Sequence, residues 1–310
     1  MKRVILTGAS GFIGYHLANE LCMKKIEVYA ICKPGSTTAS RLTELNGVRI
    51  IYCSLEESDR LPELLNERGF DVFYHLAWEG SSGLLRSDFV TQTNNIKWTG
   101  IIAEVAKKLR CRKLIVAGTV CELQSTAILQ TDRFINSSLY LLSKRSAYEL
   151  VSKLCLQLKL PLVWCAFYHP IGRYNKENQL LSNTIRLLLS NESPRFGPAD
   201  QWFDVIAVED LAYAFLLAGD KELIRNWYFV GSGQPRKLKN YIMRVGELVA
   251  PDIPLQFSYY PADGLPMEEE WLDISLFVKE TGYHPRFSFD EAVINTKKWI
   301  LEELPERLEE

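Results

Sequence analysis

Three glycines near the start of the chain constrain its fold more than any other feature. Gly8, Gly11 and Gly14 have the spacing G-x-x-G-x-x-G, directly after the apolar run Val4–Leu6 and at the head of the amphipathic stretch Gly11–Lys24. A glycine at the end of an apolar run permits a sharp turn, and glycines at the head of a helix allow it to approach a strand closely. The motif therefore predicts a strand, a tight turn and a helix in immediate succession.

The first half of the chain continues this alternation of short apolar runs and amphipathic stretches. We expect strands at Arg3–Thr7, Glu27–Cys32, Val48–Cys53, Val72–Leu76, Lys113–Ala117 and Pro161–Tyr168, and helices at Gly11–Lys24, Leu61–Arg68, Phe89–Leu109 and Ser138–Leu158. Strands without a clean period-2 alternation, separated by helices, indicate a parallel sheet covered on both faces. Right-handed crossovers then predict an α/β fold with a doubly wound parallel (Rossmann) sheet, which binds ligands at the carboxyl ends of its strands.

The glycine turn is suited to a pyrophosphate. Gly8 permits the turn, Gly11 lets the backbone approach the ligand, and Gly14 lets the helix lie against the sheet. The first helical residues, Phe12 and Ile13, would offer free backbone N–H groups at the positive end of the helix dipole. We therefore expect a nicotinamide dinucleotide to bind here.

The second expected strand bears on which dinucleotide binds. No Asp or Glu occurs between Glu27 and Glu44, so an acidic partner for the adenosine ribose is missing. Lys33 stands where a cation would meet a 2′-phosphate, and Ser36 and Arg41 are nearby in sequence. NADP(H) is thus the preferred cofactor and NAD(H) the alternative, in which case Lys33 is only a solvated loop residue.

A tyrosine and a lysine form the candidate catalytic pair. Tyr140 and Lys144 are four residues apart on an expected helix, hence on one face. The lysine charge can lower the pKa of the phenol, and the phenol can exchange a proton with a substrate oxygen while hydride moves at carbon. Thr119, at the carboxyl end of the preceding expected strand, is placed to bond the same oxygen.

These residues resemble the extended short-chain dehydrogenase/reductase proteins, in particular the nucleotide-sugar epimerase/dehydratase family. The resemblance runs nearly end to end and includes the glycine turn, the Tyr-x-x-x-Lys pair, His75-Leu76-Ala77-Trp78, Asn94-Asn95, His169-Pro170-Ile171-Gly172, Asp204–Ala212, Gly231–Pro235 and Asp273–Pro285. It implies a cofactor site that includes Leu76, Ala77, Asn95, Lys144 and His169, and a homodimer formed through Phe89–Leu109 and Ser138–Leu158.

The resemblance also implies a nucleotide-diphosphate sugar as substrate. Trp78, Thr119, Tyr140, His169 and Asn183 are the expected contacts. Asn183 would lie near the base, the alternative being that it is an ordinary residue at the start of a helix. Arg186 and Arg236 are candidates to hold the diphosphate, since guanidinium groups match phosphate oxygens, although exposed arginines are often only solvated.

One departure from the family narrows the chemistry. The family's 4,6-dehydratases carry Thr-Asp-Glu, whereas Val120 and Cys121 follow Thr119 here, which disfavours dehydration. A 4-epimerase and a 4-ketoreductase, both acting by hydride transfer at sugar C4, stay open, as does a sensor that binds the dinucleotide without turnover.

The pattern changes after about residue 170 to turn-rich stretches between short elements. We expect a dinucleotide-binding domain over residues 1–168 and a mainly substrate-binding part over 169–310, interleaved with it.

Composition excludes several other classes. The chain has 310 residues, 47% hydrophobic and 24% charged, and a net charge of −2, so it offers neither a basic field for nucleic acid nor a polybasic membrane patch. The seven cysteines and four histidines show no metal-binding spacing, and no signal segment precedes the first strand, which favours a cytoplasmic protein without a metal.

Overall fold

The computed structural model describes residues 1–132, 135–175, 179–262 and 265–303, and its central feature is a parallel sheet. Within those residues the sheet has seven strands in the order β10-β6-β5-β4-β1-β2-β3. Their bounds are β1 Arg3–Thr7, β2 Glu27–Cys32, β3 Val48–Tyr52, β4 Val72–His75, β5 Lys113–Thr119, β6 Leu162–Phe167 and β10 Trp227–Phe229. The order reverses direction between β1 and β4, and a crevice for ligands opens at such a switch point.

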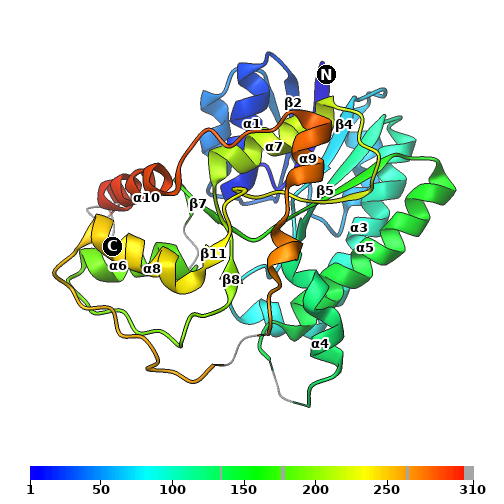
Figure 1. Ribbon diagram of the computed structural model, residues 1–310. Coiled ribbons are helices and arrows are strands. Elements are labelled where there is room, and N and C mark those ends of the chain that lie inside the picture. Colours follow the sequence, from blue (N-terminus) through cyan, green and yellow to red (C-terminus); the bar gives the residue numbers. More distant parts are fainter. Residues whose placement is uncertain (133–134, 176–178, 263–264, 304–310) are drawn as a thin grey trace.

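Helices cover both faces of this sheet (Figure 1). One face carries α1 (Phe12–Met23), α7 (Val208–Asp220) and α9 (Ser275–Thr281), and the other carries α2 (Leu61–Leu65), α3 (Phe89–Lys108) and α5 (Ser138–Leu158). Apart from the edge strand β3, which is partly exposed, the strands are largely buried on both sides, which explains why they read as continuous apolar runs. The predicted doubly wound Rossmann fold is confirmed.

Two expected elements differ from the structure by more than one residue at an end. The helix expected over Leu61–Arg68 ends at Leu65, because Asn66 adopts the left-handed conformation with φ 49°. Strand β5 runs two residues further than expected, because Gly118 and Thr119 still pair with β6.

A second group of elements lies beside the sheet (Figure 1). It contains α6 (Leu180–Leu189), α8 (Leu238–Val249) and α10 (Phe289–Glu303), with the strand pairs β7 (His169–Ile171) with β9 (Val205–Ala207) and β8 (Trp202–Phe203) with β11 (Arg236–Lys237). Apart from β11, these elements share one apolar core. Strand β10, although late in the chain, pairs with β6 in the main sheet.

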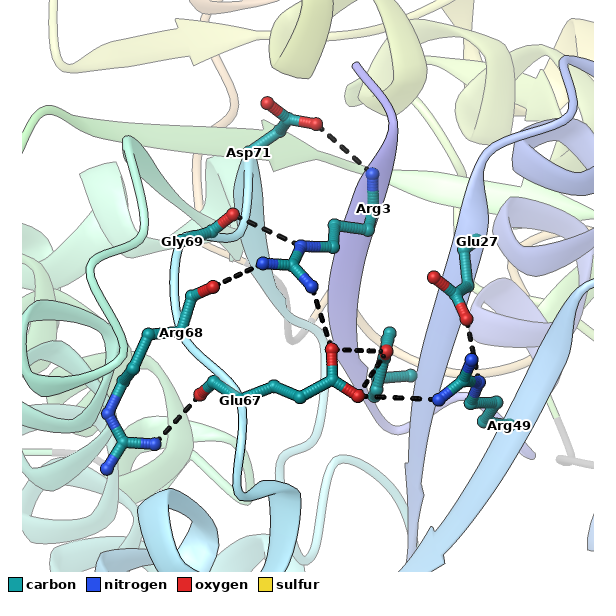
Figure 2. Close-up of polar contacts among 8 residues, drawn as sticks. Arg3, Glu27, Arg49, Glu67, Arg68, Gly69 and Asp71 are labelled. Carbon is teal, nitrogen blue, oxygen red and sulfur yellow. Dashed lines mark hydrogen bonds and ion pairs between the residues drawn. The ribbon is translucent and has the colours of Figure 1, made fainter.

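The amino ends of the strands carry a group of ion pairs and hydrogen bonds (Figure 2). Arg3, at the start of β1, binds Glu67 at 2.7 Å, and its backbone N–H donates to Asp71 at 3.1 Å. Arg49 of β3 binds Glu27 of β2 at 2.7 Å. These contacts tie the edge opposite the ligand crevice together.

None of the helices in the described part of the chain combines the length and the apolar character that crossing a bilayer requires.

Candidate active site

A large cavity follows the carboxyl ends of the central strands. Its volume is about 1010 Å³, and it extends from the glycine turn to the start of α6. The predicted site residues that line it are Gly8, Gly11, Phe12, Ile13, Gly14, Lys33, Leu76, Ala77, Trp78, Thr119, Tyr140, Lys144 and His169. The structure thus brings the glycine motif and the candidate catalytic residues to one cavity.

The glycine turn has the shape expected of a phosphate cradle. Gly8 has φ +71°, and a Cβ there would lie 2.9 Å from the backbone nitrogen of Ala77. A Cβ on Gly14 would lie 2.0 Å from the carbonyl oxygen of Gly8, so only glycine allows α1 to start this close to β1. No side chain caps α1, so its first N–H groups face the cavity without a capping partner.

At the end of β2 the cavity is lined by polar groups. The Lys33 ammonium lies 3.0 Å from the Glu79 carboxylate, and both residues line the cavity. The hydroxyl groups of Ser10 and Ser36 are 3.0 Å apart. Lys33 is therefore paired with an acid, and a ligand phosphate would compete with Glu79 for its charge.

Thr119 ends β5 at the cavity wall. Its Oγ1 accepts a hydrogen bond of 3.3 Å from the backbone N–H of Cys121. This bond uses a lone pair of the hydroxyl oxygen, so the hydroxyl hydrogen stays available for donation to a ligand oxygen. Its side chain is almost wholly buried, which shields such a bond from water.

Tyr140 and Lys144 come from successive turns of α5, as expected. The Lys144 ammonium donates to the carbonyl oxygen of Ala117 at 2.8 Å and lies 3.8 Å from the centre of the Trp78 ring. Trp78 also meets the Tyr140 ring edge to face, with 6.1 Å between the ring centres. Trp78 therefore contacts both members of the pair.

Arg86, which sequence analysis missed, lies directly on the candidate catalytic tyrosine. Its guanidinium carbon is 3.9 Å from the centre of the Tyr140 ring, and it lines the cavity. It comes from the short 3₁₀ helix Leu84–Ser87, in a loop where no motif marks it. Only the folded loop shows that this cation reaches Tyr140.

Asn95 does not line the cavity, in contrast to its expected contact with the cofactor. It is buried, and its side-chain amide both accepts from the backbone N–H of Glu79 at 2.9 Å and donates to the Glu79 carbonyl at 2.8 Å. Gln92, one turn earlier, accepts from the Trp78 indole at 3.0 Å and donates to Gly80. Both residues fix the loop that carries Trp78 and Glu79.

The three residues expected near the base and the diphosphate do not line this cavity either. Asn183 lies within α6, and Arg186 on the same helix donates to the carbonyl of Asn175 at 2.7 Å. Arg236 donates to Gln234 and lines a separate cavity of about 410 Å³. The sequence could not show this, because the side-chain directions depend on how α6 and β11 pack.

His169 lines the cavity with an unsatisfied ring nitrogen. Its Nε2 is buried and makes no hydrogen bond with any described residue. Burial lowers the pKa of this histidine to about 4, so the ring is neutral near pH 7. A neutral imidazole with a free nitrogen can bond a bound ligand without adding charge to the site.

Glu122 is a second residue that the sequence analysis missed. It follows Val120 and Cys121 in the 3₁₀ helix η4 (Val120–Gln124), is fully buried, and does not line the cavity. The only signal for it was a single carboxylate within an otherwise uncharged run after Thr119. Among the described residues, no group of His, Cys, Asp or Glu side chains could hold a metal ion.

The parallel sheet, the glycine cradle and the Thr–Tyr–Lys set define a dinucleotide-binding α/β protein of the short-chain dehydrogenase type. The chain belongs to the NAD dependent epimerase/dehydratase family, whose model matches residues 4–231.

Similar proteins carry different activities. Over 97% of its length the chain is 22% identical to a protein of Arabidopsis thaliana, the trifunctional UDP-glucose 4,6-dehydratase/UDP-4-keto-6-deoxy-D-glucose 3,5-epimerase/UDP-4-keto-L-rhamnose-reductase. The chain spans about half of the length of that protein, 47%. Its fold matches a UDP-N-acetylglucosamine 4-epimerase from Methanobrevibacter ruminantium, with a TM-score of 0.79 and 21% identity over 97% of this chain and 99% of that one. It also matches a dTDP-glucose 4,6-dehydratase from Bacillus anthracis in complex with NAD, with a TM-score of 0.77 and 16% identity over 97% of both chains.

Proposed function

We propose that this protein catalyses hydride transfer at C4 of a nucleotide-diphosphate sugar, as a 4-ketoreductase or a 4-epimerase. The observation that carries the proposal is that Thr119, Tyr140 and Lys144 line the same cavity as the glycine turn. A protein that only binds the dinucleotide has no need of a phenol, a hydroxyl and an ammonium group at the end of that cavity.

The residues fit a nicotinamide dinucleotide. Gly8 and Gly14 form a cradle that a Cβ would fill, and α1 starts without a side-chain cap. His169 Nε2 offers a free hydrogen-bonding position further along the cavity. When bound, the nicotinamide supplies or accepts the hydride.

The protein's own residues manage the proton and the geometry. Tyr140 exchanges the proton at the sugar oxygen, Thr119 donates a hydrogen bond to that oxygen, and Lys144 favours the phenolate by its charge. Trp78 packs against the Tyr140 ring and forms the cavity wall beside it.

The residues after Thr119 disfavour dehydration as the main reaction. Val120 is an apolar core residue, and burial raises the pKa of the Cys121 thiol to about 11, so the thiol stays protonated. The Glu122 carboxylate is turned away from the cavity into bonds with two indoles. Elimination of water would therefore lack the acid and base that face the sugar in Thr-Asp-Glu enzymes.

We further infer that NADP(H) is preferred over NAD(H). Lys33 lines the cavity at the end of β2, where no acidic residue of β2 meets the ribose, and Ser10 and Ser36 place two hydroxyls nearby. A 2′-phosphate would draw Lys33 away from Glu79. Lys33→Ala should then weaken NADP(H) binding and leave NAD(H) binding nearly unchanged. Equal effects on both cofactors, or none, would refute the preference.

We also infer a cytoplasmic homodimer. All seven cysteines are free thiols, which suits a reducing compartment. Apolar side chains are exposed along the two long helices expected to pair, namely Phe89 and Val90 on α3 and Leu150 and Leu156 on α5. Such a surface is typical of a face that a second copy covers.

A panel assay tests the reaction. Purified protein is incubated with nucleotide sugars and 4-keto nucleotide sugars, and both cofactor oxidation and sugar products are followed. A ketoreductase consumes NADPH with a 4-keto sugar, whereas an epimerase forms the C4 epimer with no net change in cofactor. Cofactor binding with no product from any sugar would favour the sensor instead.

A further inference from the structure

The Glu122 carboxylate is held in a buried polar site close to the carboxyl end of strand β5. Both of its carboxylate oxygens accept hydrogen bonds from indoles, Oε2 from Trp164 at 3.2 Å and Oε1 from Trp227 at 2.6 Å. The two tryptophans lie opposite each other in register on β6 and β10. Two neighbouring strands therefore hold one fully buried carboxylate.

A glycine provides the room for this arrangement. Gly118 of β5 lies against the Trp164 indole, and a Cβ at this position would be 2.1 Å from the indole nitrogen. Any larger residue would displace the very atom that donates to Glu122. Gly118 and the two indoles are thus all required for these hydrogen bonds to the Glu122 carboxylate.

The same face of α5 that carries the catalytic lysine covers this site. Lys144 and Tyr148 are one turn apart, and the Tyr148 ring packs on Trp164 with 5.5 Å between ring centres. The Lys144 ammonium donates to the carbonyl of Ala117, the residue next to Gly118. The carboxylate and the ammonium are therefore both held at the end of β5.

The negative charge of Glu122 and the positive charge of Lys144 each favour the ionised form of the other residue. A buried carboxylate or ammonium is strongly destabilised when alone, because it loses its hydration. Burial lowers the pKa of Lys144 and raises that of Glu122, and in each case the opposite charge of the partner acts against the shift. The nearby Arg86 acts the other way and further lowers the pKa of Lys144.

We propose that Glu122 is a positioning residue that keeps Lys144 charged: its carboxylate, fixed by Trp164 and Trp227, holds Lys144 as an ammonium ion beside Tyr140. This inference rests on the proposed function, in which Lys144 acts on the tyrosine. Glu122 does not touch the substrate. It acts through Lys144, and the two indoles prevent it from turning into the cavity as an acid.

Other titratable groups near Lys144 and Glu122 do not replace this effect. They are His75 on β4, Arg86, Cys121, and Tyr140 and Tyr148 on α5. Burial lowers the pKa of His75 to about 3 and raises that of Cys121 to about 11, so both are neutral near pH 7. Among the titratable groups described around the ammonium, Glu122 is thus the one carboxylic acid, and its charge opposes the loss of the Lys144 proton.

A double-mutant cycle on stability tests the pairing without any substrate. Urea unfolding at pH 7 is measured for the wild type, Glu122→Gln, Lys144→Met and the double variant. If the charges interact, the double variant is less destabilised than the sum of the two single variants. Additive effects would overturn the pairing. This outcome is independent of which reaction the enzyme catalyses.

The pH profile tests the role in the reaction. Without the carboxylate the pKa of Lys144 falls, so the ammonium is lost at lower pH, and the high-pH limb of kcat/KM should move down by about one unit or more. Trp227→Phe keeps both charges but removes the shorter indole bond, and should move the limb in the same direction by less. Glu149→Gln, an exposed carboxylate on α5 paired with Arg145, is the matched control and should not move it.

A purely structural role gives a different result. In that case Glu122→Gln and Trp227→Phe would lower kcat/KM by the same factor at every pH, with the limb unmoved, and the proposal would be wrong. Failure of the proposed function itself is recognised separately, by undiminished turnover in Tyr140→Phe.

Discussion

Gly118→Ala is the perturbation whose effect follows most directly from the geometry. The added Cβ would lie 2.1 Å from Nε1 and 2.5 Å from Cδ1 of Trp164, whose rigid ring is fully buried. Overpacking of this kind costs about 1–3 kcal/mol. Displacing the indole donor from a buried carboxylate costs about 1.5–3 kcal/mol more. We therefore expect the free energy of unfolding to fall by about 2.5–6 kcal/mol, a large part of a typical total of about 5–15 kcal/mol.

Urea unfolding followed by circular dichroism measures this loss. Gly100→Ala on α3 is the matched control, because the nearest atom to its Cβ is Leu154 Cδ2 at 4.0 Å, an ordinary contact. Because alanine is more favourable than glycine in a helix interior, Gly100→Ala should raise the free energy of unfolding by about 0.5–1 kcal/mol. Adding Trp164→Phe to Gly118→Ala should recover part of the loss, since the clashing ring is smaller. A Gly118→Ala variant as stable as Gly100→Ala would refute the reasoning.

Three further predictions follow from single contacts. Gly14→Ala places a Cβ 2.0 Å from Gly8 O and should weaken dinucleotide binding, measured by calorimetry, about 10- to 100-fold, the equivalent of 1–3 kcal/mol. Burial raises the pKa of Asp204 from 3.8 to about 6, so the folded state binds an extra proton between those values, and this group's contribution to stability falls as pH rises through that window. Asp204→Asn should remove that slope in urea titrations at pH 4 to 6. Leu150→Glu on α5 should convert the proposed dimer to monomer in light scattering, and an unchanged mass would exclude this face as the interface.

The sheet could be predicted well because its physical causes are local. A parallel strand buried on both faces must be an apolar run, and Gly8, Gly11 and Gly14 mark a turn that few other structures require. Tyr140 and Lys144 could be paired from the sequence because four residues make one helical turn.

The walls of the site could not be predicted in the same way. Arg86 reaches Tyr140 only because Gln92 and Asn95 fix the loop between β4 and α3. The Glu122 site needs Trp227, which meets Glu122 only because β10 returns to the sheet beside β6. Such contacts join segments far apart in the chain, and no local periodicity reports them.

Arg186 and Arg236 show that chemical suitability and position are separate questions. Their chemistry suits a diphosphate, but one binds the backbone of Asn175 and the other lines a separate cavity. Residue type indicates what a side chain can bind, whereas only packing determines where it points.

Isotope transfer tests the central claim most directly. The protein is given a 4-keto nucleotide sugar and a reduced cofactor carrying deuterium at C4 of the nicotinamide, and the sugar product is examined by mass spectrometry and NMR. The account predicts deuterium at sugar C4 with the wild type, and a rate reduced by orders of magnitude with Tyr140→Phe, whose cofactor affinity should be unchanged. Deuterium at another carbon, or undiminished transfer by Tyr140→Phe, would contradict it.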